Sequence, residues 1–309
     1  MSFEPLLYDF DKAIEWIESL HVKADVLRFA KYRKLLRSIS GAVQRGDMDA
    51  ALSIWDEGNN ALFEAYSLIE IYHALSSTEC ASFVQGERRE FVKGPEHVRD
   101  ENPAKSTNSA RNYAFELQVA ARFGIGEVVR LELDPAFATV VDVPFRTPLG
   151  HLFMECKRPQ GENSVEECYD LAQSGLRDRY AMFPDTVARG IIALDITKIV
   201  NPKGQLLWID SVDEASALQI KGLRAEFEWD RRVWEKPAKS EQTIGLYFHM
   251  AHLAFVRNPQ PALRYVRSGS LQRLSGATPA DAPWFQQLED AARLANRAMM
   301  YGNLIRGYR

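Results

Sequence analysis

Apolar residues recur every three or four positions through the first part of the chain. Phe10 and Ile14 begin this pattern, and the same spacing returns from Val26 to Ile39 and from Asp49 to Ile71. Such spacing is typical of amphipathic helices that bury one face. We therefore expect residues 1–84 to form an all-helical N-terminal domain in which three or four helices pack together.

Residues 85–108 break this pattern. They are polar and are interrupted by Gly, Pro and Asn, so a linker is expected there. From residue 109 to residue 309, helical and strand patterns follow one another, which predicts a mixed α/β domain. The first expected elements, in chain order, are a helix at Ser109–Phe123, strands at Glu127–Leu133, Ala138–Phe145 and His151–Lys157, a helix from about Ser164 to Met182, and an interior strand at Gly190–Ile196.

Further elements are expected to extend this sheet and to cover it. Ser109 and Ser164 are expected as N-caps of the two helices, because a serine hydroxyl can satisfy a free N–H group of the first turn. The later elements are a short strand at Gln205–Ile209, a helix from Ser211 or Asp213 to about Trp234, a strand at Thr243–Val256, and a last helix from Pro283 to about Asn303.

Charged residues interrupt two neighbouring apolar runs. Asp142 lies within the run Ala138–Phe145, and Glu155 and Lys157 end the next run. Because side chains alternate along a strand, Glu155 and Lys157 are expected to project from one face. The segment Thr147–Gly150 has the composition of a turn, so the two strands are expected to pair antiparallel and to bring Asp142 beside Glu155. A charge at Asp142 is costly unless a cation or hydrogen bonds compensate it.

The tripeptide Glu155-Cys156-Lys157, set after Val-Val-Asp-Val, resembles the motif of the PD-(D/E)xK nuclease superfamily, which has the restriction-endonuclease-like fold. The order of helix, three strands, helix and strand is similar to the αβββαβ core of that superfamily. The resemblance covers residues 105–200, about a third of the chain. Val141 stands where the name of the motif has Pro, and Cys156 fills the free position.

This resemblance implies a magnesium site at which Mn²⁺ can substitute. Asp142 and Glu155 would be carboxylate ligands and the main-chain carbonyl of Cys156 a further ligand, since Mg²⁺ prefers oxygen ligands. Lys157 would orient or deprotonate the attacking water and stabilise the developing negative charge. Glu116, from the preceding helix, would bind a second metal ion or a water molecule on the metal.

Gln173 is a further candidate site residue. Together with tyrosines of the same helix, it resembles the glutamine and tyrosine that some members of the superfamily place near the active site. Ordinary structural roles stay open for several of these residues. They are a solvated strand end for Glu155 and Lys157, a carboxylate at the border of an apolar face for Glu116, and an exposed polar face for Gln173.

Composition restricts the possible partners and the cellular compartment of the protein. The net charge of −4 argues against binding of nucleic acid by bulk electrostatics but leaves room for a local basic surface. No apolar run approaches the roughly 20 residues of a membrane span. Cys80, Cys156 and Cys168 have no paired spacing and no signal peptide is recognised, which predicts a cytoplasmic protein. His249 and His252 lie in an apolar segment and are expected to be core residues.

We therefore expect a Mg²⁺-dependent nuclease that hydrolyses phosphodiester bonds of DNA rather than RNA, in defence, restriction or repair. The N-terminal helices would recognise the substrate, bind a protein partner or form a homodimer. Two alternatives stay open. One is a nuclease-like scaffold that binds nucleic acid or protein without catalysis, and the other is hydrolysis of a nucleotide end or cap.

Overall fold

The computed structural model describes residues 3–22, 28–76, 81–84, 86–97, 100–102, 108–124, 131–202, 204, 206–210, 236, 238–257 and 262–292. The chain divides into two compact units. The first consists of Met1–Ala114, Asn201–Gln219 and Ala251–Arg267, and the second of Phe115–Val200, Ile220–Met250 and Ser268–Arg309. The chain is mixed α/β with a mostly helical N-terminal part, as the hydrophobic pattern predicts.

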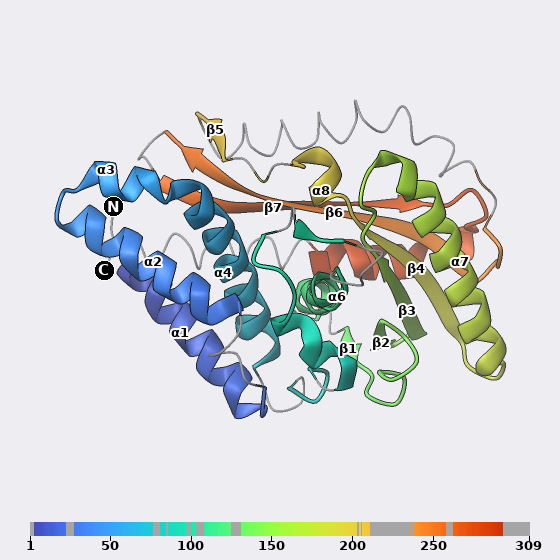
Figure 1. Ribbon diagram of the computed structural model, residues 1–309. Coiled ribbons are helices and arrows are strands. Elements are labelled where there is room, and N and C mark those ends of the chain that lie inside the picture. Colours follow the sequence, from blue (N-terminus) through green and yellow to red (C-terminus); the bar gives the residue numbers. More distant parts are fainter. Residues whose placement is uncertain are drawn as a thin grey trace. The chain divides into compact units, whose positions relative to one another are not determined.

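The N-terminal part of the first unit contains four helices among the described residues (Figure 1). They are α1 (Glu4–Ser19), α2 (Arg28–Gln44), α3 (Met48–Ser53) and α4 (Trp55–Leu75). The apolar positions that predict these helices are buried, with Phe10, Ile14 and Leu36 fully inaccessible. Asp47 begins α3 because its side chain accepts a hydrogen bond from the amide of Ala50 at 3.1 Å.

A buried charge network joins α2 and α4 in this unit. Glu64 of α4 lies 2.6 Å from Nε of Arg111 and 3.4 Å from Nη2 of Arg28. Arg28 also donates to the carbonyl of Phe91 at 2.8 Å, and Arg111 to the carbonyl of Glu96 at 3.2 Å. The network therefore ties the helices to the irregular segment that follows α4, because buried charges need such partners.

Among the described residues, seven strands form one mixed sheet. Its order is β1-β2-β3-β4-β6-β5, and β7 also pairs with β6. β2 pairs antiparallel with β1 and β3, whereas β4 pairs parallel with β3 and β6 and is interior, as expected. The strands are β1 (Glu132–Leu133), β2 (Val143–Thr147), β3 (Gly150–Lys157), β4 (Ala188–Asp195), β5 (Leu207–Ile209), β6 (Thr243–Val256) and β7 (Ala262–Arg273).

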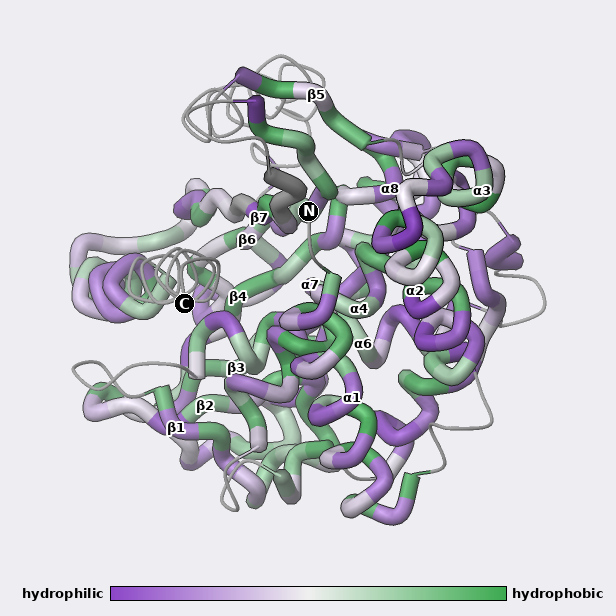
Figure 2. The backbone as a smooth tube through the Cα atoms, turned by 90° about the vertical axis from the view of Figure 1, so that its left-hand side faces the viewer, coloured by the Kyte–Doolittle hydropathy of each residue, from purple (hydrophilic) through white to green (hydrophobic). Residues whose placement is uncertain are grey.

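In the second unit, helices cover both faces of the sheet. On one face, α7 (Val165–Met182) lies along β3 and β4 (Figure 1), and Leu176 packs in one cluster with Phe153 and Ile192. On the other face, the C-terminal half of α6 (Ser109–Phe123) brings Phe123 within 4.9 Å of the ring centre of Tyr247. Figure 2 shows that hydrophobic residues follow one another along β4 and β6. Side chains on both faces of these two strands are therefore buried.

The short elements complete the described chain. Residues 282–292 are helical. The other short elements are η1 (Gly86–Val92), η4 (Glu162–Ser164), α8 (Thr197–Val200) and η5 (Pro279–Asp281).

The turn between β2 and β3 requires a glycine. Gly150 has a φ of 132°, and a Cβ added there would lie 2.4 Å from the carbonyl oxygen of Val187. The hydroxyl of Thr147 donates to the carbonyl of Gly150 at 2.9 Å and accepts from the amide of Leu149 at 3.1 Å. This turn fixes the pairing of Thr147 with Gly150 and hence the register of the hairpin.

Several predicted boundaries need correction. The strand predicted at Ala138–Phe145 begins at Val143, because Asp134 starts a series of turns: its carbonyl accepts from the amide of Phe137, and its carboxylate from the amide of Ala136. Of the strand predicted at Glu127–Leu133, residues 125–130 lie outside the described residues, and β1 is only Glu132–Leu133.

Other predictions differ from the structure near the helices. Ser164 precedes α7 but does not cap it, since its hydroxyl accepts from the amide of Gln160 and donates to the carbonyl of Gly161. β7 was not predicted. The predicted helix from Ser211 or Asp213 to Trp234 lies outside the described residues, as does the last predicted helix beyond residue 292.

A buried ion pair clamps the ends of β3 and β4. Nε of Arg158, directly after β3, lies 2.9 Å from the carboxylate of Asp195, which also accepts from the amide of Thr197 at 3.0 Å. Burial raises the pKa of Asp195, but Arg158, His249 and Thr197 outweigh that effect and leave the pKa below its usual value. The pair therefore holds these two strand ends while the carboxyl is charged.

We expect Asp195→Ala to destabilise the protein by about 3–5 kcal/mol, because it removes the carboxylate that compensates a buried guanidinium. Urea unfolding at pH 7 measures the loss. The control is Asp178→Ala, which removes the carboxylate of the exposed Arg177–Asp178 pair and should cost less than about 1 kcal/mol. Equal losses in the two variants would contradict the assigned role of Asp195.

The same comparison should depend on pH. A carboxyl with a lowered folded-state pKa contributes stability above its usual value of 3.8 and loses it as the pH falls through the folded-state pKa. The difference between wild type and Asp195→Ala should therefore be full at pH 7 and shrink below about pH 4. A difference that stays constant into acid would show that the carboxylate charge is not what stabilises this part of the sheet.

Candidate active site

Asp142, Glu155 and Lys157 come together at the end of the β2–β3 hairpin. Asp142 lies in the bend immediately before β2, and the other two lie near the end of β3. The register pairs Val143 with Met154, so the next position along the hairpin sets Asp142 opposite Glu155. The predicted neighbourhood of the two carboxylates is thus confirmed, although Asp142 precedes the strand instead of lying within it.

The ammonium of Lys157 lies between the two carboxylates. Its Nζ is 2.8 Å from Oε1 of Glu155 and 3.4 Å from Oδ2 of Asp142, and it donates to the carbonyl of Cys156 at 3.0 Å. Oδ2 of Asp142 also accepts a hydrogen bond from the amide of Cys156 at 2.8 Å. The side chain of the bend before β2 and the side chains and main chain of β3 therefore converge on a single point.

Burial and mutual charge set the protonation of this group. Burial raises the pKa of the Glu155 carboxyl, and the charge of Asp142 raises it further, whereas Lys157 and Arg179 act in the opposite direction. Burial lowers the pKa of the Lys157 ammonium, but Asp142 and Glu155 outweigh that effect, so its pKa lies above the usual value. Lys157 is therefore a cation at neutral pH beside these two acids.

One buried carboxylate oxygen of this group lacks a hydrogen-bond partner among the described residues. Oε2 of Glu155 is buried and has no hydrogen-bond partner among the described residues. A buried carboxylate oxygen in that position is costly unless a donor or a cation binds it. Oxygen atoms of Asp142 and Glu155 and the carbonyl of Cys156 are the donor type that Mg²⁺ prefers, so the residues fit such an ion.

The described side chains alone do not provide a full set of ligands for a metal ion. Among the described residues, no group of three His, Cys, Asp or Glu side chains is arranged to hold a metal ion. Mg²⁺ retains several water ligands and needs only one or two carboxylates, so this finding is compatible with the two acids of the hairpin.

Gly175 of α7 lies directly over Glu155. A Cβ added at Gly175 would be 2.7 Å from Oε1 and 3.0 Å from the carboxyl carbon of Glu155. A glycine inside a helix costs up to about 1 kcal/mol relative to alanine, so its presence in the middle of α7 calls for a reason. The close approach of the carboxylate supplies that reason, and a glycine within a strongly helical run was the sequence signal for it.

Glu116 and the thiol of Cys156 belong to the opposite side of β3. Cys156 alternates with Glu155 and Lys157 along the strand, so its thiol projects away from them. Burial raises the pKa of this thiol well above its usual value, and the charges of Asp142 and Glu116 raise it further. Glu116 of α6 is itself buried, with 9% of its surface exposed, so the alternative of a solvated border carboxylate does not fit.

Gln173 is buried instead of exposed. Its amide nitrogen donates to the hydroxyl of Tyr169 at 2.7 Å, and its amide oxygen accepts from the main-chain amide of Lys239 at 3.1 Å. The amide oxygen therefore joins α7 to the segment before β6, whereas the amide nitrogen bonds within α7, and neither contact involves the acid pair.

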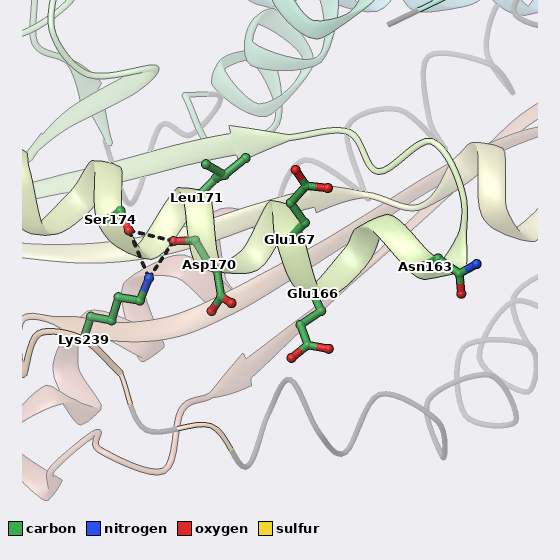
Figure 3. Close-up of a pocket in the computed structure, with 7 residues that line it drawn as sticks. All are labelled: Asn163, Glu166, Glu167, Asp170, Leu171, Ser174 and Lys239. Atoms are coloured by element: carbon green, nitrogen blue, oxygen red, sulfur yellow. Dashed lines mark hydrogen bonds between the residues drawn. The ribbon is translucent and has the colours of Figure 1, made fainter. Parts of the chain in front are cut away.

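An open pocket of about 520 Å³ lies on the outer side of α7 (Figure 3). Its lining is acidic, but lysines partly offset this charge. Lys239 donates to the hydroxyl of Ser174 at 3.0 Å and to the carbonyl of Asp170 at 3.1 Å, and Lys236 pairs with Glu166 and Asp170. The candidate catalytic residues do not line this pocket. It is lined by Asn163, Glu166, Glu167, Asp170, Leu171, Ser174 and Lys239.

No family model, no curated protein and no solved structure matches this chain. Within the part of the chain that the structure describes, no helix has both the length and the apolar character needed to cross a membrane. His249 and His252 are both buried, as expected of core residues.

We expect Gly175→Ala to displace the Glu155 carboxylate. In an open helical position this change stabilises a protein by up to about 1 kcal/mol, but the added methyl group would contact Glu155 and remove that gain. Urea unfolding and Mn²⁺ titration calorimetry would show less than the full gain together with weaker metal binding.

The control for this change is Gly161→Ala, since a Cβ at Gly161 meets no atom within 4 Å. It should bind Mn²⁺ as the wild type does. A Gly175→Ala protein with the full gain in stability and unchanged Mn²⁺ affinity would contradict the close packing of α7 on the Glu155 carboxylate.

Proposed function

We propose that this protein is a nuclease that hydrolyses phosphodiester bonds of DNA with a divalent metal ion, Mg²⁺ or Mn²⁺. The observation that carries the proposal is the convergence of Asp142, Glu155 and Lys157 at one hairpin end, where a buried carboxylate oxygen has no hydrogen-bond partner among the described residues. Two acids and a lysine at one end of a hairpin are groups that metal-assisted phosphodiester cleavage can use.

Asp142 and Glu155, with the carbonyl of Cys156, are the groups that would hold the metal ion. When bound, the ion supplies Lewis-acid polarisation of the phosphate and lowers the pKa of water. Cys156 donates its amide to Asp142 and presents its carbonyl beside Lys157, so both main-chain groups of one residue position the ligand set.

Lys157 is proposed to act as a cation. Its raised pKa keeps the ammonium charged beside the carboxylates, and a fixed positive charge stabilises the negative charge that develops on the phosphate. Of the roles expected from the resemblance, orientation of water and charge stabilisation fit this protonation state better than removal of a proton. Glu116 belongs to the opposite side of β3 from Glu155 and Lys157, so its proposed binding of a second metal ion or of a water molecule on the metal rests on the resemblance alone. Gln173 is a proposed site residue that acts through α7.

The alternative of a binding scaffold without catalysis explains less. A scaffold gains nothing from a buried carboxylate oxygen that lacks a donor, since such an atom costs free energy. A cation substrate or cofactor compensates it directly. Defence, restriction or repair is the proposed setting, by analogy with the superfamily alone.

Titration of Mn²⁺ followed by incubation with plasmid and single-stranded DNA tests the proposal. The wild type should bind metal and nick the plasmid, and Asp142→Ala should lose both properties. Lys157→Ala should retain metal binding but cleave at least about a hundredfold more slowly, because it removes charge stabilisation and not a ligand. Asp170→Ala, which removes an acid of the pocket in Figure 3, is the matched control and should remain active.

Each other outcome has a defined meaning. A fully active Lys157→Ala protein contradicts the assignment. Metal binding without cleavage of either DNA indicates another phosphoester, such as a nucleotide end or cap. If neither wild type nor Asp142→Ala binds Mn²⁺, the acids are structural and the scaffold alternative takes the place of the nuclease.

A further inference from the structure

Helix α2 has an unusual charge for this chain. Its 17 residues, Arg28–Gln44, include five lysines or arginines and no aspartate or glutamate. The chain as a whole contains 42 acidic and 38 basic residues, so two or three acids would be expected in a segment of this length. Arg28 is buried in the charge network with Glu64, and the other four basic residues remain.

These cations gather on one side of the helix. Lys31, Lys34 and Arg37 are exposed at intervals of three residues, which places them along one face. A groove of about 460 Å³ lies among Ala30, Arg33, Lys34, Arg37 and Ser38. Ala30 and Ser38 are small, so a ligand can approach the helix closely between the long basic side chains.

Arg45 extends this face beyond the end of α2. It follows Lys34 by 11 residues, which is about three helical turns. A Cβ added at Gly41 would lie 3.2 Å from Nη1 of Arg45, so the guanidinium folds back along the helix. Within the described residues, no carboxylate lies at ion-pair distance from Lys34 or Arg45.

The other cations of this face form ion pairs, two of them with the same aspartate. Asp11 of α1 lies 2.7 Å from Nη2 of Arg37 and 3.9 Å from Nη1 of Arg33. Lys31 pairs with the exposed carboxylate of Glu96. The carboxylate of Asp11 therefore pairs with two of the cations that line the groove, and a substitution of Asp11 would release both.

Other basic clusters of the chain are engaged within the protein. Lys93 pairs with Glu90, and Arg257 with Asp210. Arg267 is buried against Glu70, and the guanidinium of Arg88 lies 4.2 Å from the ring centre of Phe83. Among the described residues, the face of α2 thus brings together several exposed cations, two of which, Lys34 and Arg45, have no carboxylate at ion-pair distance.

We propose that the groove on α2, with Arg45, binds the sugar–phosphate backbone of DNA. This inference rests on the proposed nuclease function and adds the surface by which the substrate is held. Double-stranded DNA carries one negative charge per about 1.7 Å of axis, and the basic face from Lys31 to Arg45 extends about 21 Å. Phosphate contacts from lysine, arginine and serine position a duplex without reading its sequence.

The test is fluorescence polarisation of a labelled DNA duplex with the full-length chain in EDTA, where metal-dependent cleavage does not occur. Affinity is measured between about 50 and 200 mM salt. The double variant Lys34→Ala/Arg45→Ala should reduce the slope of log affinity against log salt by about 1.8, which is about 0.9 for each lost phosphate contact. At about 0.1 M salt, each lost contact should weaken binding by up to about tenfold.

A variant that binds DNA more tightly than the wild type provides a second test, because a misfolded protein would not gain affinity. Asp11→Asn frees Arg33 and Arg37 from their carboxylate and should tighten binding and steepen the slope. The matched control is Lys12→Ala/Lys93→Ala, which removes two exposed cations that each pair with an acid three residues away. It should behave as the wild type does, apart from a small effect of net charge.

Slopes that are equal for the α2 double variant and its control would overturn the inference. Binding to phosphatidylserine vesicles in preference to DNA would overturn it in favour of an anionic lipid surface. Failure of the nuclease proposal is distinguishable, because DNA binding is measured in EDTA, where the metal-dependent cleavage step does not take place. Tight binding through α2 without cleavage would refute the nuclease, whereas cleavage with an unchanged salt slope would refute the α2 surface.

Discussion

The ammonium of Lys157 is the group on which the candidate site depends. Asp142 and Glu155 are set opposite each other by the hairpin, and two partly buried carboxylates at that separation repel each other. Lys157 contacts both and also donates to the carbonyl of Cys156, so it offsets the repulsion and ties the side chains to the main chain. A divalent cation offers the carboxylates the same compensation, and Oε2 of Glu155, which has no hydrogen-bond partner among the described residues, is open to it.

The surroundings of this group are rigid elements of the second unit. α7 closes over the Glu155 carboxylate at Gly175, which leaves the carboxylate little room to turn. The Arg158–Asp195 pair holds the ends of β3 and β4 immediately beyond Lys157. A site supported on strands and a packed helix keeps its geometry better than one built on loops.

Much of the fold follows from local pattern. The bounds of α6 and β6 agree with those predicted, because each has a continuous apolar period and a clear end. The start of β2 does not, because the turn that delays it depends on hydrogen bonds to Asp134. β7 has no predicted counterpart, and one of its arginines, Arg267, is buried against Glu70 by a contact distant in sequence that no local pattern reveals.

The candidate site likewise has residues that local sequence pattern predicts and residues that it does not. Asp142, Glu155 and Lys157 are near in sequence, and strand alternation alone brings them together. The contacts of Gln173 with Lys239, and of Gly175 with Glu155, join a helix to segments remote from it, and no local pattern reveals them. The basic face of α2 was overlooked for a related reason. Its significance depends on which cations lack a carboxylate, and that is a property of the tertiary structure.

The glycine turn at Gly150 has a consequence for the chemical identity of the site. The turn sets which residues of β3 face α7, and alternation makes that choice binary. A slip by a single residue would turn Glu155 and Lys157 away and present Met154 and Cys156 in their place. An acid and an amine would give way to a thioether and a thiol, which are ligands for soft metals and not for magnesium. A turn without a side chain thus decides whether hard oxygen ligands or soft sulfur atoms face α7.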